Sequence, residues 1–103
     1  MTPLSVRPVG VVRKDGKDIL IQINKEYQDA LLGLEGFSHI LVLYWFHEND
    51  TPEIRRTQRV YPRSDRNHPL TGVFGTHSPA RPNLIGITRC KILDISGSII
   101  SVD

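Results

Sequence analysis

The segment Ser38-His-Ile-Leu-Val-Leu-Tyr-Trp-Phe-His47 decides the fold, because it carries seven consecutive apolar or aromatic residues between polar ends. A run of this kind is typical of a β-strand that is covered on both faces. We therefore expect it to form the central strand of a sheet. Its aromatic residues should pack in the core, although one ring could also face a cationic ligand: Tyr44, Trp45 and Phe46.

Two pairs of strands flank this run. Toward the N-terminus, Val9–Val12 and Asp18–Ile23 are separated by Lys14-Asp-Gly-Lys17, whose Asp-Gly step favours the tight turn of a β-hairpin. Toward the C-terminus, Leu84–Ile95 and Ser98–Val102 are joined across a Ser-Gly turn of the same kind. These hairpins predict a largely antiparallel sheet.

The stretch from Lys25 to Leu34 follows a different pattern, since its apolar residues recur at three- and four-residue spacing. This spacing predicts one short amphipathic helix, which Gly33 and Gly36 should end. Short strands, frequent turn signals and a single helix together indicate a mainly β fold. We expect a small antiparallel β-barrel with one short helix.

The bulk composition bounds the domain count and the location of the protein. A chain of 103 residues with 39% apolar content suits one domain, which we expect to span residues 1–103. The net charge of +2 is too small to argue by itself for nucleic-acid binding. The single cysteine, Cys90, excludes an intrachain disulfide and fits a reducing compartment. No stretch approaches the ~18 apolar residues of a membrane span, so we expect a cytoplasmic protein without a membrane partner.

The segment Thr71–Gly86 concentrates groups that can bind a polar ligand. Pro79 and Pro82 restrict its backbone, so the arginine between them could hold a carboxylate or phosphate at little entropic cost. The alternative is an ordinary connection stiffened by proline, because Ser, Pro, Asn and Gly are common loop residues. The candidate ligand-binding residues of this segment are Thr76, His77, Ser78, Arg81 and Asn83.

The histidines do not suggest a metal site. His39 and His47 stand at the two ends of the apolar strand, roughly 26 Å apart at ~3.3 Å per residue if the strand is straight. They cannot share a metal ion within that strand, and no close histidine pair elsewhere supports one, so we expect no metal. His39 is better explained as a structural residue. His47, followed by Glu48 at a strand end, is the histidine that we expect to contact a ligand.

A basic run lies in the polar stretch between Glu48 and Arg66. Arginines at this density can attract a phosphate backbone, with an affinity that falls steeply as salt rises. The alternative is a solvated loop. The run consists of Arg55, Arg56, Arg59, Arg63 and Arg66.

Two stretches together closely resemble the TsaA-like family. They are Leu34-Glu-Gly-Phe-Ser-His-Ile-Leu-Val-Leu-Tyr-Trp-Phe-His47 and Gly72-Val-Phe-Gly-Thr-His-Ser-Pro-Ala-Arg-Pro-Asn-Leu-Ile-Gly86. The family pattern runs approximately FSH(I/L), apolar residues, FH, and then GVFATRSPxRPNPIG. Pro8-Val-Gly-Val-Val12 is also similar to the family's first strand, so the resemblance covers nearly the whole chain.

The resemblance implies a small β-barrel methyltransferase that uses S-adenosylmethionine and is usually a homodimer. Characterised members methylate the threonylcarbamoyl-modified adenosine in the anticodon loop of certain tRNAs, so the resemblance implies tRNA as the substrate. Two other hypotheses stay open. One is an S-adenosylmethionine-binding or RNA-binding module without turnover, and the other is a purely structural dimerisation domain.

The resemblance also implies roles for particular residues. His47 and Glu48 match the family's strand-end cofactor contact, and His77 stands where the family has arginine. Ile87 falls where the family lines its cofactor pocket, and we add the loop hydroxyls of Thr76 and Ser78 to the cofactor-binding set. No residue is assigned to catalysis. The residues expected to bind the substrate are Arg81, Asn83, Arg55, Arg56 and Arg59.

Three departures from the family pattern carry expectations of their own. His77 replaces a permanent charge with one that titrates near neutrality, so ligand binding could weaken or depend on pH. A Pro-Arg-Gln segment that longer members carry after the first strand is absent, as in many short members. The family's DGTPVLDIKPY-like segment contributes to the cofactor site and would begin shortly after Asp103, so we expect this chain to hold only part of that site.

Overall fold

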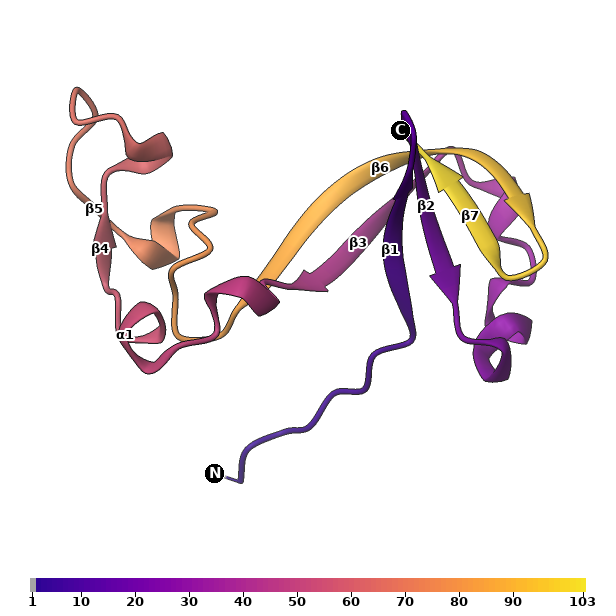
Figure 1. Ribbon diagram of the computed structural model, residues 1–103, viewed down its shortest axis with the longest axis horizontal. Helices are drawn as coiled ribbons and strands as arrows, with labels where there is room; N and C mark the ends of the chain where they lie inside the picture. The colour runs from indigo at the N-terminus through magenta and orange to yellow at the C-terminus, as the bar shows by residue number, and fades with distance from the viewer. Residues whose placement is uncertain (1) are drawn as a thin grey trace. The chain divides into compact units, whose positions relative to one another are not determined.

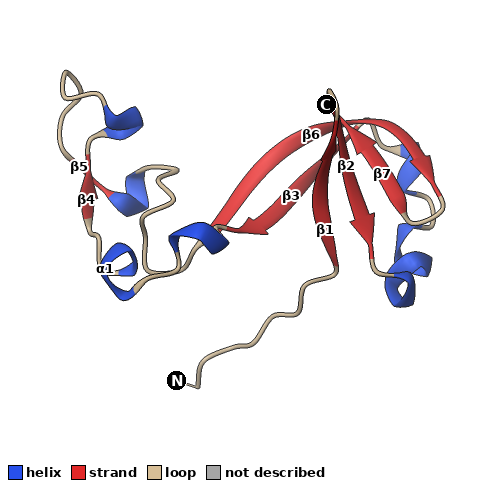
Figure 2. Cartoon of the chain, viewed as in Figure 1, coloured by secondary structure: helices blue, strands red, loops and turns tan. Residues whose placement is uncertain are grey.

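The computed structural model describes residues 2–103, and its regular elements are mostly β-strands. The chain divides into two compact units. The sheet unit consists of Met1–Leu41 and Arg89–Asp103, and the loop unit consists of Val42–Thr88. Strands dominate the sheet unit, whereas turns and short helices dominate the loop unit (Figure 2).

Five strands form one sheet in the order β1-β2-β7-β6-β3 (Figure 1). The pairings of β1 with β2, β2 with β7 and β6 with β7 are all antiparallel. The sheet is curled into a half-barrel, which confirms the expected mainly β, antiparallel fold. The strands are β1 (Gly10–Asp15), β2 (Asp18–Ile23), β3 (His39–Trp45), β6 (Ile85–Ser96) and β7 (Ile99–Val102).

Both hairpins form where the sequence predicts turns. Gly16 has a φ of +62° and Gly97 a φ of +60°, the left-handed backbone that glycine adopts without a steric penalty. Because the turns set the register, each strand pairs with its neighbour from the residue next to the turn. The pairs that flank the two turns are Asp15 with Asp18 and Ser96 with Ile99.

The expectation that the apolar run forms a central, fully covered strand is wrong. β3 lies at the end of the sheet order, next to β6 alone. Its side chains include Leu41, which is 63% exposed, and Leu43, which is 66% exposed. An apolar sequence indicates that a segment tends to be buried, but it does not show which other part of the protein buries it. Within residues 2–103, the face of β3 that carries Leu41 and Leu43 is therefore largely exposed.

The expected amphipathic helix is present but shorter and more tightly wound. Lys25–Leu31 forms a 3₁₀ helix (η1), and Leu34–Gly36 forms a separate 3₁₀ turn (η2). Gly33 between them has a φ of +82°, so it ends the first helix before Leu34. No residue of η1 is buried, so tertiary packing does not favour the longer α form. Among residues 2–103, we find no helix with the length and apolar content needed to cross a membrane.

The loop unit includes the stretch that was expected to be polar and exposed. Its longest regular α-helical piece is one turn, in which the N-cap Thr51 accepts a 3.2 Å hydrogen bond from the backbone N–H of Ile54. Two of its strands pair antiparallel with each other. Its short elements are η3 (His47–Asn49), α1 (Pro52–Arg55), β4 (Arg59–Val60), η4 (Pro62–Ser64), β5 (Thr71–Gly72) and η5 (Val73–Gly75).

Each unit has its own small core. In the sheet unit, Ile21 of β2 pairs with Ile100 of β7, and both side chains are buried. In the loop unit, Val73 is 3% exposed and Leu84 is fully buried. The carbonyl oxygen of Leu84 also accepts a 2.8 Å hydrogen bond from the backbone N–H of Phe46. Leu84 therefore anchors the C-terminal end of the loop that the sequence singled out.

Candidate functional site

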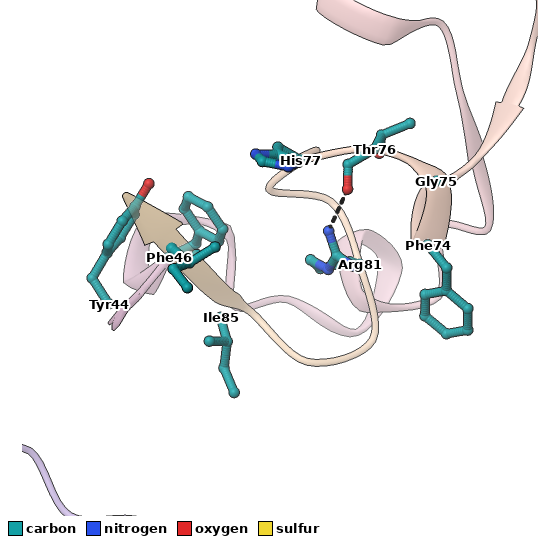
Figure 3. Close-up of a pocket in the computed structure, with 10 residues that line it drawn as sticks. Tyr44, Phe46, Phe74, Gly75, Thr76, His77, Arg81 and Ile85 are labelled. Carbon is teal, nitrogen blue, oxygen red and sulfur yellow. Dashed lines mark hydrogen bonds between the residues drawn. The ribbon is translucent and has the colours of Figure 1, made fainter. Parts of the chain in front are cut away.

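A pocket of about 430 Å³ lies within the loop unit. Residues from the end of β3, the start of β6, η5 and the loop after η5 line it (Figure 3). This volume falls in the usual range of small-molecule sites. The lining residues are Tyr44, Phe46, Phe74, Gly75, Thr76, His77, Arg81, Ile85, Gly86 and Ile87.

Two aromatic rings form one wall of the pocket. Tyr44 and Phe46 stand two residues apart, so their side chains leave the same face of the backbone. Their ring centroids are 5.2 Å apart and their planes lie at 79°, an edge-to-face contact. The hydroxyl of Thr88 donates a 3.1 Å hydrogen bond to the phenolic oxygen of Tyr44. These contacts fix the orientation of the aromatic wall.

Gly86 leaves room for the aromatic wall. It is buried near the start of β6, and a Cβ atom at this position would lie 2.6 Å from Cζ of Phe46 and 2.7 Å from the ring of Tyr44. Carbon atoms do not approach this closely without repulsion, so any other residue would displace the rings. The glycine is therefore required for packing.

The segment Thr76–Asn83, here called the pocket loop, is shaped by its own hydroxyl groups. Oγ1 of Thr76 donates to the carbonyl oxygen of Val73 at 2.9 Å and accepts from the backbone N–H of Ser78 at 3.1 Å. Oγ of Ser78 accepts from the backbone N–H of Ala80 at 3.2 Å. Both hydroxyls therefore support local turns of the backbone.

Arg81 reaches back across the pocket loop. Its Nη1 donates to the carbonyl oxygen of Thr76 at 2.9 Å, as Figure 3 shows. The side chain is half-buried and lines the pocket. Within residues 2–103, Nε and Nη2 of Arg81 have no hydrogen-bond partner. Arg81 can therefore brace the loop with one nitrogen and offer the others to an anion.

Phe74 and His77 form an exposed rim. Phe74 is 82% exposed, and its ring points away from Tyr44 and Phe46 (Figure 3). His77 is also exposed and lines the pocket. The rim thus presents one phenyl ring and one imidazole ring to an incoming ligand.

Arg55 of α1 contacts the other end of the pocket loop. Its Nε donates to the carbonyl oxygen of Pro82 at 2.9 Å, and its Nη1 lies 3.1 Å from Oδ1 of Asp50. The guanidinium carbon lies 5.5 Å from the centroid of the Trp45 ring. Two neighbouring arginines are exposed and, within residues 2–103, make no hydrogen bond, ion pair or cation–π contact through their side chains: Arg56 and Arg59.

The structure brings some of the sequence-predicted site residues together and leaves others apart. His47 and Glu48 lie on η3 with side chains 82% and 86% exposed, and Nε2 of His47 is 4.0 Å from Oε1 of Glu48. Residues 2–103 contain no group of three His, Cys, Asp or Glu side chains that could hold a metal ion. The pocket lining includes Thr76, His77, Arg81 and Ile87, and it does not include His47, Glu48, Ser78, Asn83, Arg55, Arg56 or Arg59.

Several lining residues escaped the sequence analysis. Tyr44 and Phe46 were interpreted mainly as core residues, and four others lie in the segment Thr71–Gly86 that the sequence singled out but were not named as ligand-binding residues. The sequence did contain a signal for the aromatic residues. Alternate residues of a strand share a face, so Tyr44 and Phe46 at the end of one strand could have been placed together beside the polar segment that follows. The unassigned residues are Phe74, Gly75, Ile85 and Gly86.

Two solved structures share this fold. TrmO from Pseudomonas aeruginosa matches with a TM-score of 0.69 and 20% identity, covering 99% of this chain and 48% of that one. A second TrmO structure matches with a TM-score of 0.71 and 20% identity, covering 100% of this chain and 49% of that one. The chain thus spans about half the length of these proteins. The fold is therefore the mainly β fold of the TrmO type.

The profile of the tRNA-methyltransferase O N-terminal domain matches residues 7–103. The chain is 43% identical over 98 residues to a probable S-adenosyl-L-methionine-binding protein of Methanocaldococcus jannaschii, covering 95% of this chain and 78% of that protein. It is 41% identical over 73 residues to the human tRNA (adenine(37)-N6)-methyltransferase, covering 71% of this chain and 16% of that protein.

The chain therefore belongs to the tRNA-methyltransferase O family, which confirms the resemblance to TsaA-like proteins. This is a family of tRNA methyltransferases that depend on S-adenosylmethionine. Family membership names a cofactor against which the lining of the pocket can be tested.

Proposed function

We propose that this chain binds S-adenosylmethionine in the pocket of the loop unit and transfers its methyl group to an adenosine of tRNA. The observation that carries the proposal is one pocket of about 430 Å³ that combines the Tyr44–Phe46 wall with His77 and Arg81. Membership of a tRNA-methyltransferase family supports the same function.

The pocket residues fit the parts of this cofactor. S-adenosylmethionine has an adenosine end, a sulfonium centre and an amino-acid end. The aromatic faces of Tyr44 and Phe46 attract a sulfonium cation, and Ile87 adds apolar surface for the adenosine. The imidazole of His77 can donate a hydrogen bond to the carboxylate. Glu48 lies on η3, outside the pocket lining, and its exposed carboxylate could contact the amino group from there.

The chain's own task is to hold and orient the reactants. When bound, the cofactor supplies an activated methyl group, which is transferred by in-line displacement. Gly86 and the aromatic wall limit where the ligand can lie. Arg81 holds the pocket loop in shape through its hydrogen bond to the carbonyl oxygen of Thr76. Orientation of this kind can lower a barrier by several kcal/mol, up to roughly 7–11 in favourable cases.

The acceptor that we propose is the threonylcarbamoyl-modified adenosine of a tRNA anticodon loop, methylated in the cytoplasm. This nucleoside carries a carboxylate, which suits the free donors of Arg81. Asn83 is exposed at the end of the pocket loop and can donate to a base or a sugar. Arg56 and Arg59 are exposed and suit the phosphate backbone.

We also propose that two copies of the chain associate. The support is the uncovered face of β3, on which Leu41 and Leu43 are 63% and 66% exposed. Exposed apolar side chains that adjoin one another often mark an interface. Analytical ultracentrifugation should show a species of twice the chain mass of 11.7 kDa. A monomer at every concentration would count against association.

A second candidate function is a module that binds S-adenosylmethionine or RNA without turnover. His77 favours it, because the TsaA-like pattern has arginine at this position. Relatives in two archaea also carry the name of probable S-adenosyl-L-methionine-binding proteins. Transfer of labelled methyl groups from the cofactor to tRNA would exclude this alternative.

Calorimetry and nucleoside mass spectrometry test the main proposal together. We expect saturable binding of S-adenosylmethionine to the chain, and a methylated form of the modified adenosine after incubation with bulk tRNA. Binding without methylation would favour the module without turnover. Absence of both binding and methylation would refute the proposal.

A further inference from the structure

We propose that Arg55 is a positioning residue, which fixes the pocket loop through the carbonyl group of Pro82 and does not itself bind the substrate. The sequence grouped Arg55 with Arg56 and Arg59 as contacts to RNA, and the structure separates it from them. The inference rests on the proposed function only for its cofactor-binding measurement.

Three contacts hold the guanidinium group of Arg55. Nε donates to the carbonyl oxygen of Pro82 at 2.9 Å, Nη1 lies 3.1 Å from Oδ1 of Asp50, and the group lies 5.5 Å from the centroid of the Trp45 ring. A planar group that is held along its edges and over one face has a single favoured orientation. With 37% and 44% of the Arg55 and Asp50 side chains exposed, the ion pair alone would be weak, so the orientation depends on all three contacts.

These contacts reduce the capacity of Arg55 for a phosphate. Arginine binds phosphate best through two parallel donors, and in Arg55 two of the three side-chain nitrogens, Nε and Nη1, already donate within the chain, so that within residues 2–103 only Nη2 has no partner. Arg56 is the next residue, is exposed, and makes no side-chain hydrogen bond or ion pair within residues 2–103. Attraction of RNA by the basic run should therefore come from Arg56 and other exposed arginines.

Pro82 transmits the position of Arg55 to the pocket. The proline ring fixes its own φ angle, so holding its carbonyl group also restricts the preceding residue, Arg81, which lines the pocket. At the opposite end of the pocket loop, Arg81 donates to the carbonyl oxygen of Thr76 at 2.9 Å. Two guanidinium groups thus hold the two ends of the loop, one from α1 and one from the loop itself.

The turn that carries Arg55 has the features needed to present it. Thr51 caps α1 by accepting from the backbone N–H of Ile54 at 3.2 Å, and Pro52 occupies the first helical position. Asp50 stands directly before the cap, from which its carboxylate reaches the side chain of Arg55. The ion pair therefore joins the segment before α1 to the last residue of the helix.

The substitution Arg55→Lys separates a positioning role from a charge role. Lysine keeps the positive charge that a phosphate senses, but it lacks the planar fork that contacts Pro82, Asp50 and Trp45 together. We expect R55K to raise the Kd for S-adenosylmethionine about tenfold by calorimetry. Its affinity for tRNA, and the salt dependence of that affinity, should stay within about twofold of wild type.

Arg56 provides the matched control. R56K and R56A should both leave the Kd for S-adenosylmethionine unchanged, because Arg56 makes no contact with the pocket loop. R56A should weaken tRNA binding, and R56K should retain most of it. A higher Kd for S-adenosylmethionine in R55K but not in R56K would show that the position of the Arg55 side chain, and not its charge, decides its role.

Amide hydrogen exchange of the chain without cofactor gives a second readout. The backbone N–H groups of Ser78 and Ala80 are hydrogen-bonded within the pocket loop at 3.1 Å and 3.2 Å. We expect R55K to speed exchange of these two amides about tenfold and to leave the amides of β7 unchanged. D50N should act in the same direction but more weakly, because Asp50 only orients Arg55.

The outcomes distinguish this inference from the proposed function. Unchanged exchange and an unchanged Kd for S-adenosylmethionine in R55K, with weaker tRNA binding in R55A, would overturn the inference. If the wild-type chain does not bind S-adenosylmethionine, the proposed function fails and the exchange result still decides the role of Arg55. If thermal melts show that R55K is unfolded, the same measurements on D50N decide it.

Discussion

The sheet unit and the loop unit are held together by different kinds of interactions. In the sheet unit, antiparallel backbone pairing joins β1, β2, β7 and β6, and the buried side chains are simple aliphatic groups such as Ile21 and Ile100. In the loop unit, particular side chains hold the backbone, as Thr76, Arg81 and Arg55 do through hydrogen bonds. Every residue except proline can join a backbone ladder, but only a few side chains can replace those three.

This difference predicts how substitutions should behave in each unit. A change in the sheet unit should alter the free energy of unfolding and leave the pocket intact. A change in the loop unit should alter ligand binding even where its effect on stability is small. Four variants test this division, beginning with the one with the largest expected effect.

Truncation of the core of the sheet unit should have the largest effect. Ile100 is 3% exposed and pairs with Ile21, so Ile100→Ala should lower the free energy of unfolding by about 2–5 kcal/mol. Urea denaturation measures this loss. Leu93→Ala is the control, because Leu93 is 55% exposed, and it should change stability by less than about 1 kcal/mol. A higher Kd for S-adenosylmethionine in folded Ile100→Ala protein would contradict the expectation that changes in the sheet unit leave the pocket intact.

A methyl group at Gly86 should disrupt the pocket. Its Cβ would lie 2.6 Å from Phe46, so Gly86→Ala should lower stability by about 1–3 kcal/mol. Displacement of the aromatic wall should also weaken cofactor binding at least about tenfold in calorimetry, roughly 1.4 kcal/mol. Gly36→Ala is the matched control, because a Cβ at Gly36 meets nothing within 4 Å. Equal effects of the two substitutions would contradict the packing role of Gly86.

Loss of the N-cap of α1 should have a smaller and more local effect. Thr51→Ala removes the acceptor for the backbone N–H of Ile54 and should lower stability by about 1 kcal/mol, measured by thermal denaturation. Because α1 carries Arg55, the Kd for S-adenosylmethionine should rise a few-fold as well. Thr51→Ser keeps the hydroxyl acceptor and should restore both properties. If serine restores neither, the cap does not determine the position of Arg55.

Removal of two exposed arginines should have the smallest effect on the folded chain. The double substitution Arg56→Ala with Arg59→Ala should leave stability unchanged and should weaken tRNA binding about twofold to fivefold. The slope of log affinity against log salt should flatten by about 1 to 2. The double substitution Arg7→Ala with Arg13→Ala removes two exposed arginines of the sheet unit and controls for net charge. Equal loss of affinity in that control would show that tRNA senses only the overall charge.

Much of the fold could be predicted because its signals are local. The turns at Gly16 and Gly97 follow from glycine in short polar segments between apolar strands, since tight turns require backbone angles that few residues adopt. The polar segment around Arg81 was recognisable for a related reason. Prolines and hydrogen-bonding side chains were concentrated in a few residues, and the resemblance to TsaA-like proteins gave that segment a cofactor.

The errors arose where the outcome depends on distant partners. The apolar residues of β3 favour burial, but only the strand order of the sheet shows that β3 is an edge strand. The spacing from Lys25 to Leu34 fits a helix, but the absence of a buried face leaves it a short 3₁₀ helix. Tyr44 and Phe46 are aromatic residues of the kind that usually pack in a core. In the folded chain they lie beside Gly86 and form one wall of the pocket instead.

The sequence by itself determined the mainly β class, both hairpins, the family and the segment that carries the candidate site, because turn geometry and motif spacing are properties of neighbouring residues. Only the tertiary structure decided which arginine braces the pocket loop and which remain exposed. Arg55 and Pro82 are separated by 27 positions along the chain and joined by a 2.9 Å hydrogen bond. No local pattern encodes such a pair, because the carbonyl group of Pro82 is chemically the same as every other carbonyl until folding places it beside one guanidinium group.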